Sequence, residues 1–459
     1  MKFMVENLGL LNQAEIEIGD LTILCGENNS GKTYAVYAFY GFWRLLPENI
    51  NELILRHKDS FIQKEKNIFA IEEAKFIQIH ANLKNEMNEL YKNKLAKVLG
   101  GNADIYKDAK FELSFEILNY EKIFKQKNFF FNVYKKDENI IFEFFDRDDL
   151  SSQNIHLFLV YLIISRLFYR HQINIISVER TGIAMFYNEL NINRNDILAG
   201  LTKNNQDILA SLTQNNQENI INNIIDYMQK VSRYPLPITD NISLINDISI
   251  VTNQKSFIAE SKNNEILDLL WQIVGGKYII NDYGLQFATD AKQKILQKHK
   301  TINIQQTSSS VKSLFLLDLY IRFQAQKGDI LIIDEPELNL HPKNQILLAR
   351  LLVMLVNIGI KVFISTHSDY ILREFSSCIC LKNISDENLE NLEEYSKQMQ
   401  LDANKVRAYQ TIKIRDEITT ESVKITQDDG IYMNTFNDII KEQNRNQDKI
   451  YEQILKSQS

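Results

Sequence analysis

The chain has 459 residues, 44% of them hydrophobic, and its 52 lysines and arginines against 59 aspartates and glutamates give a formal net charge of −7. This composition supports a buried core and excludes wholesale disorder. The net acidity excludes polyanion binding through overall charge, so a nucleic-acid contact would need a local basic patch. Only 15 residues are glycine and 5 are proline, so a cluster of glycines is informative.

Cysteine content and hydropathy predict a cytoplasmic protein without a membrane span. Cys25, Cys378 and Cys380 are too few for a disulfide framework, and the last two lack the further ligands of a zinc site. The first residues contain no apolar region typical of a secretory signal. The most apolar run, 155–168, is shorter than the roughly 20 residues that cross a bilayer.

The N-terminal residues predict two strands and a helix around a short loop. Apolar and polar residues alternate over 14–18, which predicts a half-buried strand, and the apolar run Leu21–Cys25 predicts a strand buried on both faces. Helical spacing follows from Tyr34 to Leu46 and ends at Pro47. We assign residues 1–47 to the first part of a core domain.

Two insertions follow. Residues 48–154 combine a charged helical arm over 50–99 with three β-like runs (110–119, 128–134 and 140–145). Residues 191–270 form a predicted helical insertion with a tandem eleven-residue repeat over 196–217. Eleven residues make three helical turns, so the apolar stripe of the repeat stays in register. A partner-facing helix and a local duplication that lengthens the insertion both explain this repeat.

Two of the remaining segments are assigned to the core domain, and the last is assigned to a C-terminal extension. Residues 155–190 contain an apolar helix and a buried strand over 173–178. Residues 271–385 contain two further buried strands, Asp329–Asp334 and Lys361–Thr366. Residues 386–459 are predicted to be a C-terminal extension, with short strands (406–414 and 422–425) and a closing polar helix.

The first motif with chemical content lies between the buried strand and the helix. It fits the P-loop pattern Gly-x-x-x-x-Gly-Lys-Thr, in which backbone N–H groups and a helix N-terminus surround a phosphate. Lys32 is expected to neutralise the β- and γ-phosphates, and Thr33 to contact Mg²⁺. The predicted ATP-binding residues are Gly26, Glu27, Asn28, Asn29, Ser30, Gly31, Lys32 and Thr33.

The second motif is an apolar strand that ends in two acids, Asp334 and Glu335. The C-terminal ends of strands in an α/β sheet are where phosphates bind. Asp334 is therefore expected to hold Mg²⁺, directly or through water. Glu335 is expected to be the general base that polarises the attacking water.

The third motif is a buried strand that ends at His367, within Ser365-Thr366-His367-Ser368. We expect this histidine to hydrogen-bond the γ-phosphate and the water. The predicted catalytic residues are therefore Lys32, Glu335 and His367.

Together the motifs resemble the ABC-type ATPase heads of the SMC and OLD (overcoming lysogenization defect) families. They resemble more closely the compact AAA/ABC-like ATPases of prokaryotic anti-phage operons, such as PARIS-type and Septu-type systems. The resemblance implies an α/β fold, a P-loop NTPase with an ABC/SMC-head-like core, a mixed α/β insertion lobe and a helical insertion. The matching stretches are Gly26–Thr33, Ser177–Gly182, Thr307–Ser313, Asp334–Pro342 and Ser365–Asp369.

The resemblance also implies a contact across a head-to-tail dimer. In such heads a serine-led signature segment binds the γ-phosphate held by the other subunit. Here Ser308, Ser309 and Ser310 open an apolar helix over 311–323 without the two glycines usual in the signature, so a plain N-cap also explains them. Glu179 stands where the family's Q-loop carries glutamine, and we expect it to face Mg²⁺ or water.

The function that follows is an ATP-hydrolysing switch with ATP and Mg²⁺ as cofactors, assembled as a homodimer or higher homo-oligomer. The resemblance implies the sensor or regulator subunit of an anti-phage or foreign-DNA defence system, with a separate nuclease or toxin effector. A nucleic acid or a phage protein is a candidate partner, and a membrane is not expected.

Two other functions stay open. An OLD-like protein with its own nuclease activity would need a Toprim domain, but the short segment after Leu381 contains no Asp-x-Asp pair. The nucleotide-binding subunit of a transporter would also be a separate chain without spans. The degenerate signature, the missing Q-loop glutamine and the large insertions argue against it.

Basic residues that could contact nucleic acid are Arg166, Arg170, Arg180 and the lysines of the stretch Lys292–Lys300. A basic run is also typical of a solvated helix face. A DNA affinity that falls with rising salt would support the nucleic-acid interpretation.

Overall fold

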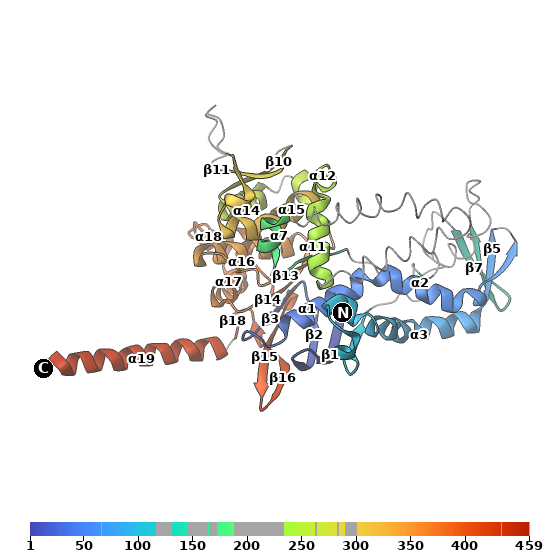
Figure 1. Cartoon of the computed structure of the whole chain (residues 1–459), viewed down its shortest axis with the longest axis horizontal. Helices are drawn as coiled ribbons and strands as arrows, with labels where there is room; N and C mark the ends of the chain where they lie inside the picture. The colour runs from blue at the N-terminus through green and yellow to red at the C-terminus, as the bar shows by residue number, and fades with distance from the viewer. Residues whose placement is uncertain are drawn as a thin grey trace, which may run out of the picture.

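A nine-stranded sheet organises the computed structural model, which describes residues 1–65, 67–115, 131–144, 164, 172–187, 234–261, 264–281, 284–289, 301–432 and 434–458. The strand order is β6-β1-β2-β16-β15-β3-β14-β13-β9 (Figure 1). The strands are β1 (Lys2–Leu8), β2 (Leu11–Glu17), β3 (Leu21–Cys25), β6 (Lys110–Ser114), β9 (Ile173–Ile176), β13 (Ile330–Asp334), β14 (Lys361–Thr366), β15 (Val406–Ile414) and β16 (Glu417–Ser422).

The five strands from β15 to β9 run parallel, so their C-terminal ends meet at one edge of the sheet. Both faces of this half are covered, because alternate residues of one strand belong to different apolar clusters. In β13, Ile330 and Ile332 belong to one cluster, and Leu331 and Ile333 to the other. Continuous apolar runs are what a parallel strand between two helical layers requires. The α/β class and the P-loop NTPase fold predicted from the sequence are confirmed.

Helices pack on both faces of the sheet. The first cluster contains residues of α1 (Lys32–Arg44) and α3 (Glu73–Lys92), and the second contains residues of α15 (Ser309–Leu319), α16 (Pro342–Asn357) and α17 (Asp369–Cys380). The remaining helices around the parallel half are α7 (Arg180–Met185), α11 (Leu236–Asn246), α12 (Ile248–Val251), α13 (Phe257–Glu260), α14 (Asn264–Val274) and α18 (Asp386–Leu389). A smaller sheet joins β10 (Gly276–Asn281), β11 (Gly284–Thr289) and β12 (Thr301–Asn303).

A separate lobe lies at the far end of two long helices (Figure 1). Its four-stranded sheet has the order β4-β5-β8-β7, with the strands β4 (Ile62–Glu65), β5 (Ile68–Glu72), β7 (Phe131–Lys136) and β8 (Asn139–Phe144). The two long helices are α2 (Leu46–His57) and α3 (Glu73–Lys92), and α4 (Leu95–Leu99) follows α3 and contacts α1. The prediction of continuous helix over 50–99 is wrong, because β4 and β5 interrupt it. Pro47 opens α2, since a proline is tolerated in the first turn, where no N–H partner is needed.

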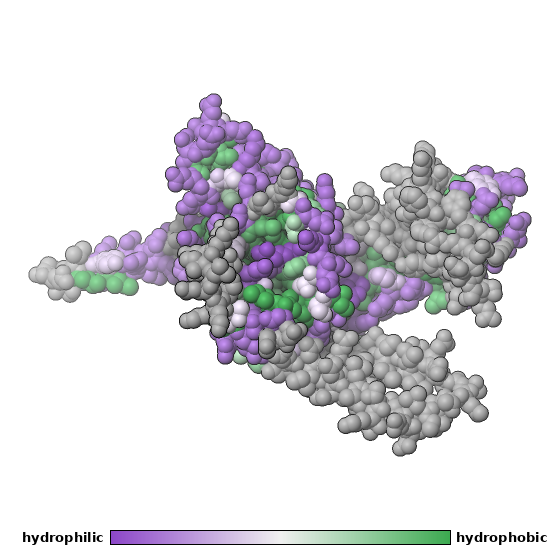
Figure 2. All heavy atoms as spheres, turned by 90° about the horizontal axis from the view of Figure 1, so that it is seen from above, coloured by the Kyte–Doolittle hydropathy of each residue, from purple (hydrophilic) through white to green (hydrophobic). Residues whose placement is uncertain are grey.

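The C-terminal segment contributes to the main sheet. β15 pairs with β3 in parallel and β16 pairs with β15 antiparallel. The strand predicted over 422–425 is wrong, because β16 ends at Ser422 and β17 (Ile425–Thr426) pairs with β18 (Gly430–Ile431). The closing helix is confirmed as α19 (Asn434–Gln458), which extends away from the body (Figure 1). Ile450, Tyr451 and Ile454 are exposed near its end, where Figure 2 shows an apolar patch.

Several predictions fall outside the described residues. These are the helix over 155–168 apart from Ile164, which is buried in the first cluster, the eleven-residue repeat and the lysines of 292–300. Within the described part of the chain, no helix is long and apolar enough to span a membrane.

Candidate functional site

The loop between β3 and α1 has the backbone of a phosphate-binding loop. Gly26 and Gly31 adopt φ values of 144° and 84°, a region that side chains disfavour. A Cβ at Gly26 would collide with the side chain of Thr411, and a Cβ at Gly31 with that of Leu11. The loop therefore leads from the sheet edge into the N-terminus of α1, where free N–H groups favour an anion.

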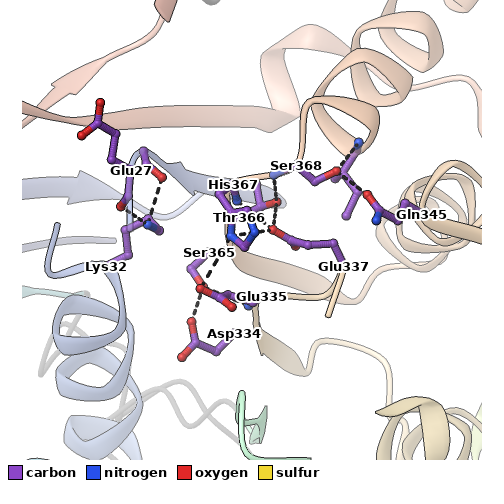
Figure 3. Close-up of polar contacts among 12 residues, drawn as sticks. Glu27, Lys32, Asp334, Glu335, Glu337, Gln345, Ser365, Thr366, His367 and Ser368 are labelled. Atoms are coloured by element: carbon purple, nitrogen blue, oxygen red, sulfur yellow. Dashed lines mark hydrogen bonds and ion pairs between the residues drawn. The ribbon is translucent and has the colours of Figure 1, made fainter. Parts of the chain in front are cut away.

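Lys32 directs its amine back into this loop. Its Nζ donates to the carbonyl oxygens of Gly26 at 3.0 Å and Glu27 at 2.6 Å, as Figure 3 shows. Burial lowers the pKa of Lys32, and the nearby carboxylates of Glu335 and Asp334 act in the opposite direction. The loop thus holds a positive charge at its centre.

Asp334 ends β13 with its carboxyl fully buried. Its Oδ1 accepts the Ser365 hydroxyl of β14, and its Oδ2 has no hydrogen-bond partner among the described residues. Burial raises the pKa of Asp334 to about 6, and the neighbouring hydroxyls of Ser365 and Thr33 act in the opposite direction. A buried carboxylate oxygen without a partner is costly, so this site is suited to a cation.

Glu335 follows with a left-handed backbone, φ 49°. Its N–H donates to the carbonyl oxygen and the hydroxyl of Ser365, both at 3.1 Å. Its carbonyl oxygen accepts a hydrogen bond from Arg180 Nη2 at 2.5 Å. Such a conformation costs on the order of 1–3 kcal/mol and persists where the surroundings fix it. Ser365 and Arg180 fix it here, which determines where the half-buried Glu335 carboxylate stands.

His367 lies between two acids of the loop after β13. Its Nδ1 is 3.6 Å from Glu335 Oε1 and 3.2 Å from Glu337 Oε1. Glu337 Oε1 also accepts the backbone N–H of His367 at 2.8 Å and the Thr366 hydroxyl at 2.9 Å (Figure 3). The ends of β13 and β14 are therefore joined through Glu337.

Two cavities lie on either side of Asn28, Asn29 and Ser30, which line both. The smaller one, about 440 Å³, is lined by Leu10, Asn28, Asn29, Ser30, Gly31, Lys32, Thr33, Tyr34, Glu335 and His367. The larger one, about 650 Å³, is lined by Gly26, Glu27, Asn28, Asn29, Ser30, His367, Gln410, Thr411, Ile412, Lys413 and Ile418. In the smaller cavity the side chains of Lys32, Glu335 and His367 line the same space. The larger cavity shows that β15 closes the other side of the loop.

Arg180 lies beneath the site with its side chain almost completely buried. Its guanidinium donates to four carbonyl oxygens, those of Ser177, Ser313, Asp334 and Glu335. Burial lowers its pKa to about 10, so it is protonated at neutral pH. The interpretation of Arg180 as a nucleic-acid contact is wrong, because its charge is turned inward. Arg166 and Arg170 lie outside the described residues.

Glu179 lies near the acids. Its Oε2 accepts the hydroxyl of Tyr37 from α1 at 3.2 Å, and its charge is close enough to raise the pKa of Asp334. The structure therefore places it beside the sheet edge where the sequence predicted a Q-loop residue. Its contact with a metal or water stays a prediction.

Ser308, Ser309 and Ser310 form the N-terminus of α15, away from the linings of the two cavities. Ser308 Oγ accepts the N–H of Val311 at 3.3 Å, which confirms the N-cap. Ser308 and Ser309 are exposed. A contact with a second subunit stays a prediction.

The residues at the sheet edge fit Mg²⁺ bound together with a nucleotide. The described residues contain no cluster of three or more His, Cys, Asp or Glu that could hold a metal alone. Mg²⁺ usually takes one or two protein oxygens and fills its other positions with phosphate and water. The unpartnered Oδ2 of Asp334 and the hydroxyl of Thr33 offer such oxygens.

Sequence reasoning missed the roles of Glu337 and Arg180. Glu337 lies three residues after Asp334, in the loop that the sequence already marked, but its burial depends on β14. Arg180 follows the predicted strand over 173–178, and its four carbonyl partners come from segments far apart in the chain. A single arginine in the sequence carries no sign of that.

Comparison with known proteins gives a family match over most of the chain. A family model described as AAA ATPase domain matches residues 1–372. No curated protein matches the chain.

Similar solved structures are SMC heads. The SMC head domain of Pyrococcus furiosus with an extended coiled coil, bound to the C-terminal domain of ScpA, has 12% identity and a TM-score of 0.30, covering 92% of this chain and 96% of that chain. An SMC head bound to the C-winged helix domain of ScpA has 9% identity and a TM-score of 0.33, covering 93% and 98%. The SMC head domain from Thermotoga maritima has 11% identity and a TM-score of 0.31, covering 92% and 98%.

Proposed function

The chain belongs to the AAA ATPase domain family, and from that premise we propose that it is an ATP-hydrolysing molecular switch that uses Mg²⁺. The observation that carries the proposal is the smaller cavity, where Lys32, Glu335 and His367 line one space. These residues come from three segments of the chain: Lys32 from the start of α1, and Glu335 and His367 from the positions just after β13 and β14. Their convergence supports phosphate binding together with attack by water.

Binding of the triphosphate falls to the loop and α1. The N–H groups of the loop and the N-terminal end of the α1 dipole favour the phosphate charge. Lys32 Nζ now rests on carbonyl oxygens of Gly26 and Glu27, and it lies within reach of a phosphate in the cavity that it lines. The same cavity is also lined by half-exposed Leu10 and by Tyr34. We assign the nucleotide base to these two side chains.

Thr33 and Asp334 are proposed to hold the metal ion. When bound, Mg²⁺ neutralises charge on the transferred phosphoryl group. Asp334 would then be ionised and its Oδ2 satisfied, which removes the cost of the unpartnered oxygen. Glu335 is proposed to accept the proton of the attacking water, and its fixed backbone keeps the carboxylate at the cavity wall. His367 is proposed to donate to the γ-phosphate.

Replacing Glu335 by Gln tests the proposal. ATP turnover by the wild type, measured as phosphate release, should fall about 10²–10⁴-fold in Glu335→Gln, the usual contribution of a general base. ATP binding should persist. We also propose that ATP joins two heads, so sedimentation should show a larger species trapped by ATP in this variant. Unchanged turnover would remove Glu335 from the base role.

The cellular role proposed is that of a sensor or regulator subunit in a prokaryotic defence system with a separate effector. The sequence resemblance supports this part. Co-expression with the product of an adjacent gene, followed by purification with and without ATP, tests it. A nuclease or toxin that binds the chain in one nucleotide state supports the role, and a membrane permease as the partner would overturn it.

A further inference from the structure

Glu337 is an acid of the site to which neither the motifs nor the family match assigns a role. Its side chain is 5% exposed, whereas those of Glu335 and His367 are 23% and 42% exposed. It does not line either cavity among the residues that the structure describes. It therefore stands behind His367, away from a ligand in either space.

One oxygen of this carboxylate serves three groups at the end of β14. Glu337 Oε1 accepts the Thr366 hydroxyl at 2.9 Å and the His367 N–H at 2.8 Å, and it lies 3.2 Å from His367 Nδ1. Figure 3 shows these contacts converging on Glu337. Backbone and ring of the histidine are thus held by the same atom.

We propose that Glu337 is a positioning residue that fixes the orientation and the proton of the His367 ring, and through it the phosphate contact of the ATPase reaction. The inference rests on the proposed function. A carboxylate only accepts hydrogen bonds, so the neighbouring Nδ1 carries a proton. Nε2 is then the nitrogen left to face the phosphate, and it can donate to the phosphate when the ring carries both protons.

Other charged groups also face this ring. Glu335 approaches Nδ1 from the same loop, but at 3.6 Å. Lys32 lines the smaller cavity together with His367, and Glu27 and Lys413 line the larger one. Glu337 differs from all of them, because it is buried and bonded to the backbone of the histidine as well as close to its ring.

A double-mutant cycle separates positioning from a purely structural role. Glu337→Gln keeps an oxygen that can accept from the Thr366 hydroxyl and the His367 N–H but loses the charge. We expect kcat for ATP to fall about 10–100-fold, the usual effect of losing such a supporting partner, with KM for ATP changed less than about threefold. In a His367→Asn background the same substitution should have almost no further effect. Equal losses in both backgrounds would overturn the proposal.

Imidazole ¹⁵N NMR tests the same contact without turnover. The His367 resonances are identified by their loss in His367→Asn. The wild type should show the Nδ1-protonated form when the ring is neutral, and Glu337→Gln should shift the ring toward the other tautomer. Glu335→Gln, whose oxygen is farther away, should leave the tautomer as in the wild type. An unchanged tautomer in Glu337→Gln would refute the positioning role.

The two arms also separate this inference from the proposed function. Absence of ATP turnover in the wild type would remove the proposed function, while the NMR result would still decide whether Glu337 holds the ring. Thermal unfolding checks that the variants are folded. If Glu337→Gln does not fold, Glu337→Asp keeps the charge but withdraws it by one methylene, and a partial loss of kcat with the tautomer kept is expected. Full kcat in that variant would contradict positioning.

Discussion

Lys32 and Asp334 lie on opposite sides of one site, and their polar atoms differ in how many hydrogen bonds they make. The amine of Lys32 is hydrogen-bonded to two carbonyl oxygens of its own loop, so the basic side is complete as it stands. The acidic side is not, because Asp334 Oδ2 and Glu337 Oε2 are buried without hydrogen-bond partners in the described part of the chain. The acidic side therefore has buried oxygens that the proposed Mg²⁺ would satisfy, and its backbone is held by a residue outside the loop.

Arg180 holds the backbone carbonyl oxygens of Asp334 and Glu335. Replacing it should lower the free energy of unfolding more than any other substitution proposed here. Arg180→Met would leave four carbonyl oxygens, including those of Asp334 and Glu335, without their donor. A buried acceptor left unsatisfied costs about 1–3 kcal/mol, so we expect a loss of at least about 4 kcal/mol in the free energy of unfolding. Urea unfolding measures it. A loss below about 1 kcal/mol would show that the acidic side does not depend on Arg180.

Substitutions of Asp334 and Lys32 test the comparison directly. The pKa of Asp334 is raised from 3.8 to about 6, so the folded state prefers its neutral form. The resulting stability is fully present below pH 3.8 and is lost as the pH rises through about 6. At 1.36 kcal/mol per pKa unit, the ionised carboxylate costs up to about 3 kcal/mol at pH 8.

Without Mg²⁺ and nucleotide, Asp334→Asn should therefore be more stable than the wild type at pH 8 by up to about 3 kcal/mol, with the difference gone near pH 4. Lys32→Met is the matched control. Burial lowers the pKa of Lys32, so any cost of its charge is also present at low pH, and the substitution should not produce a gain confined to pH 8. Urea unfolding at the two pH values measures both variants. An Asp334→Asn variant that is no more stable than the wild type at pH 8 would refute the asymmetry.

Ser308→Ala, at the exposed N-terminus of α15, should have the smallest effect on the free energy of unfolding. Loss of an N-cap costs typically about 1 kcal/mol. If the serines also contact a nucleotide bound by a second subunit, turnover per chain should fall more in concentrated than in dilute protein. Phosphate release as a function of protein concentration measures this. The same modest change at every concentration would leave Ser308 as a cap alone.

Local pattern was sufficient for the strands and loops that carry the site. The strands Leu21–Cys25 and Lys361–Thr366 have the predicted bounds, because continuous apolar runs ending in polar clusters are typical of buried parallel strands. Parallel strands bring their C-terminal ends to one edge, so the meeting of Lys32, Asp334 and His367 also followed from the sequence.

Local sequence pattern does not predict the features that depend on contacts between residues far apart in the chain. The sequence predicts 406–414 as a strand of an extension, but β15 lies next to β3 in the main sheet. Strand order depends on pairing partners hundreds of residues away in the chain. The residues of β4 and β5 resemble their charged helical neighbours in sequence, which predicts a helix, but β4 pairs with β5 and β5 pairs with β8. Burial of Arg180 and Glu337 likewise depends on segments that meet only in the folded chain.

A crystal structure of Glu335→Gln with ATP and Mg²⁺ would show whether the residues of the proposed site surround the nucleotide. We expect the triphosphate on the loop of residues 26–33 and the ion between Thr33 and Asp334. The His367 ring should contact the γ-phosphate while its Nδ1 stays beside Glu337 Oε1. A nucleotide bound elsewhere, or an ion that Asp334 does not contact, would contradict the proposed site.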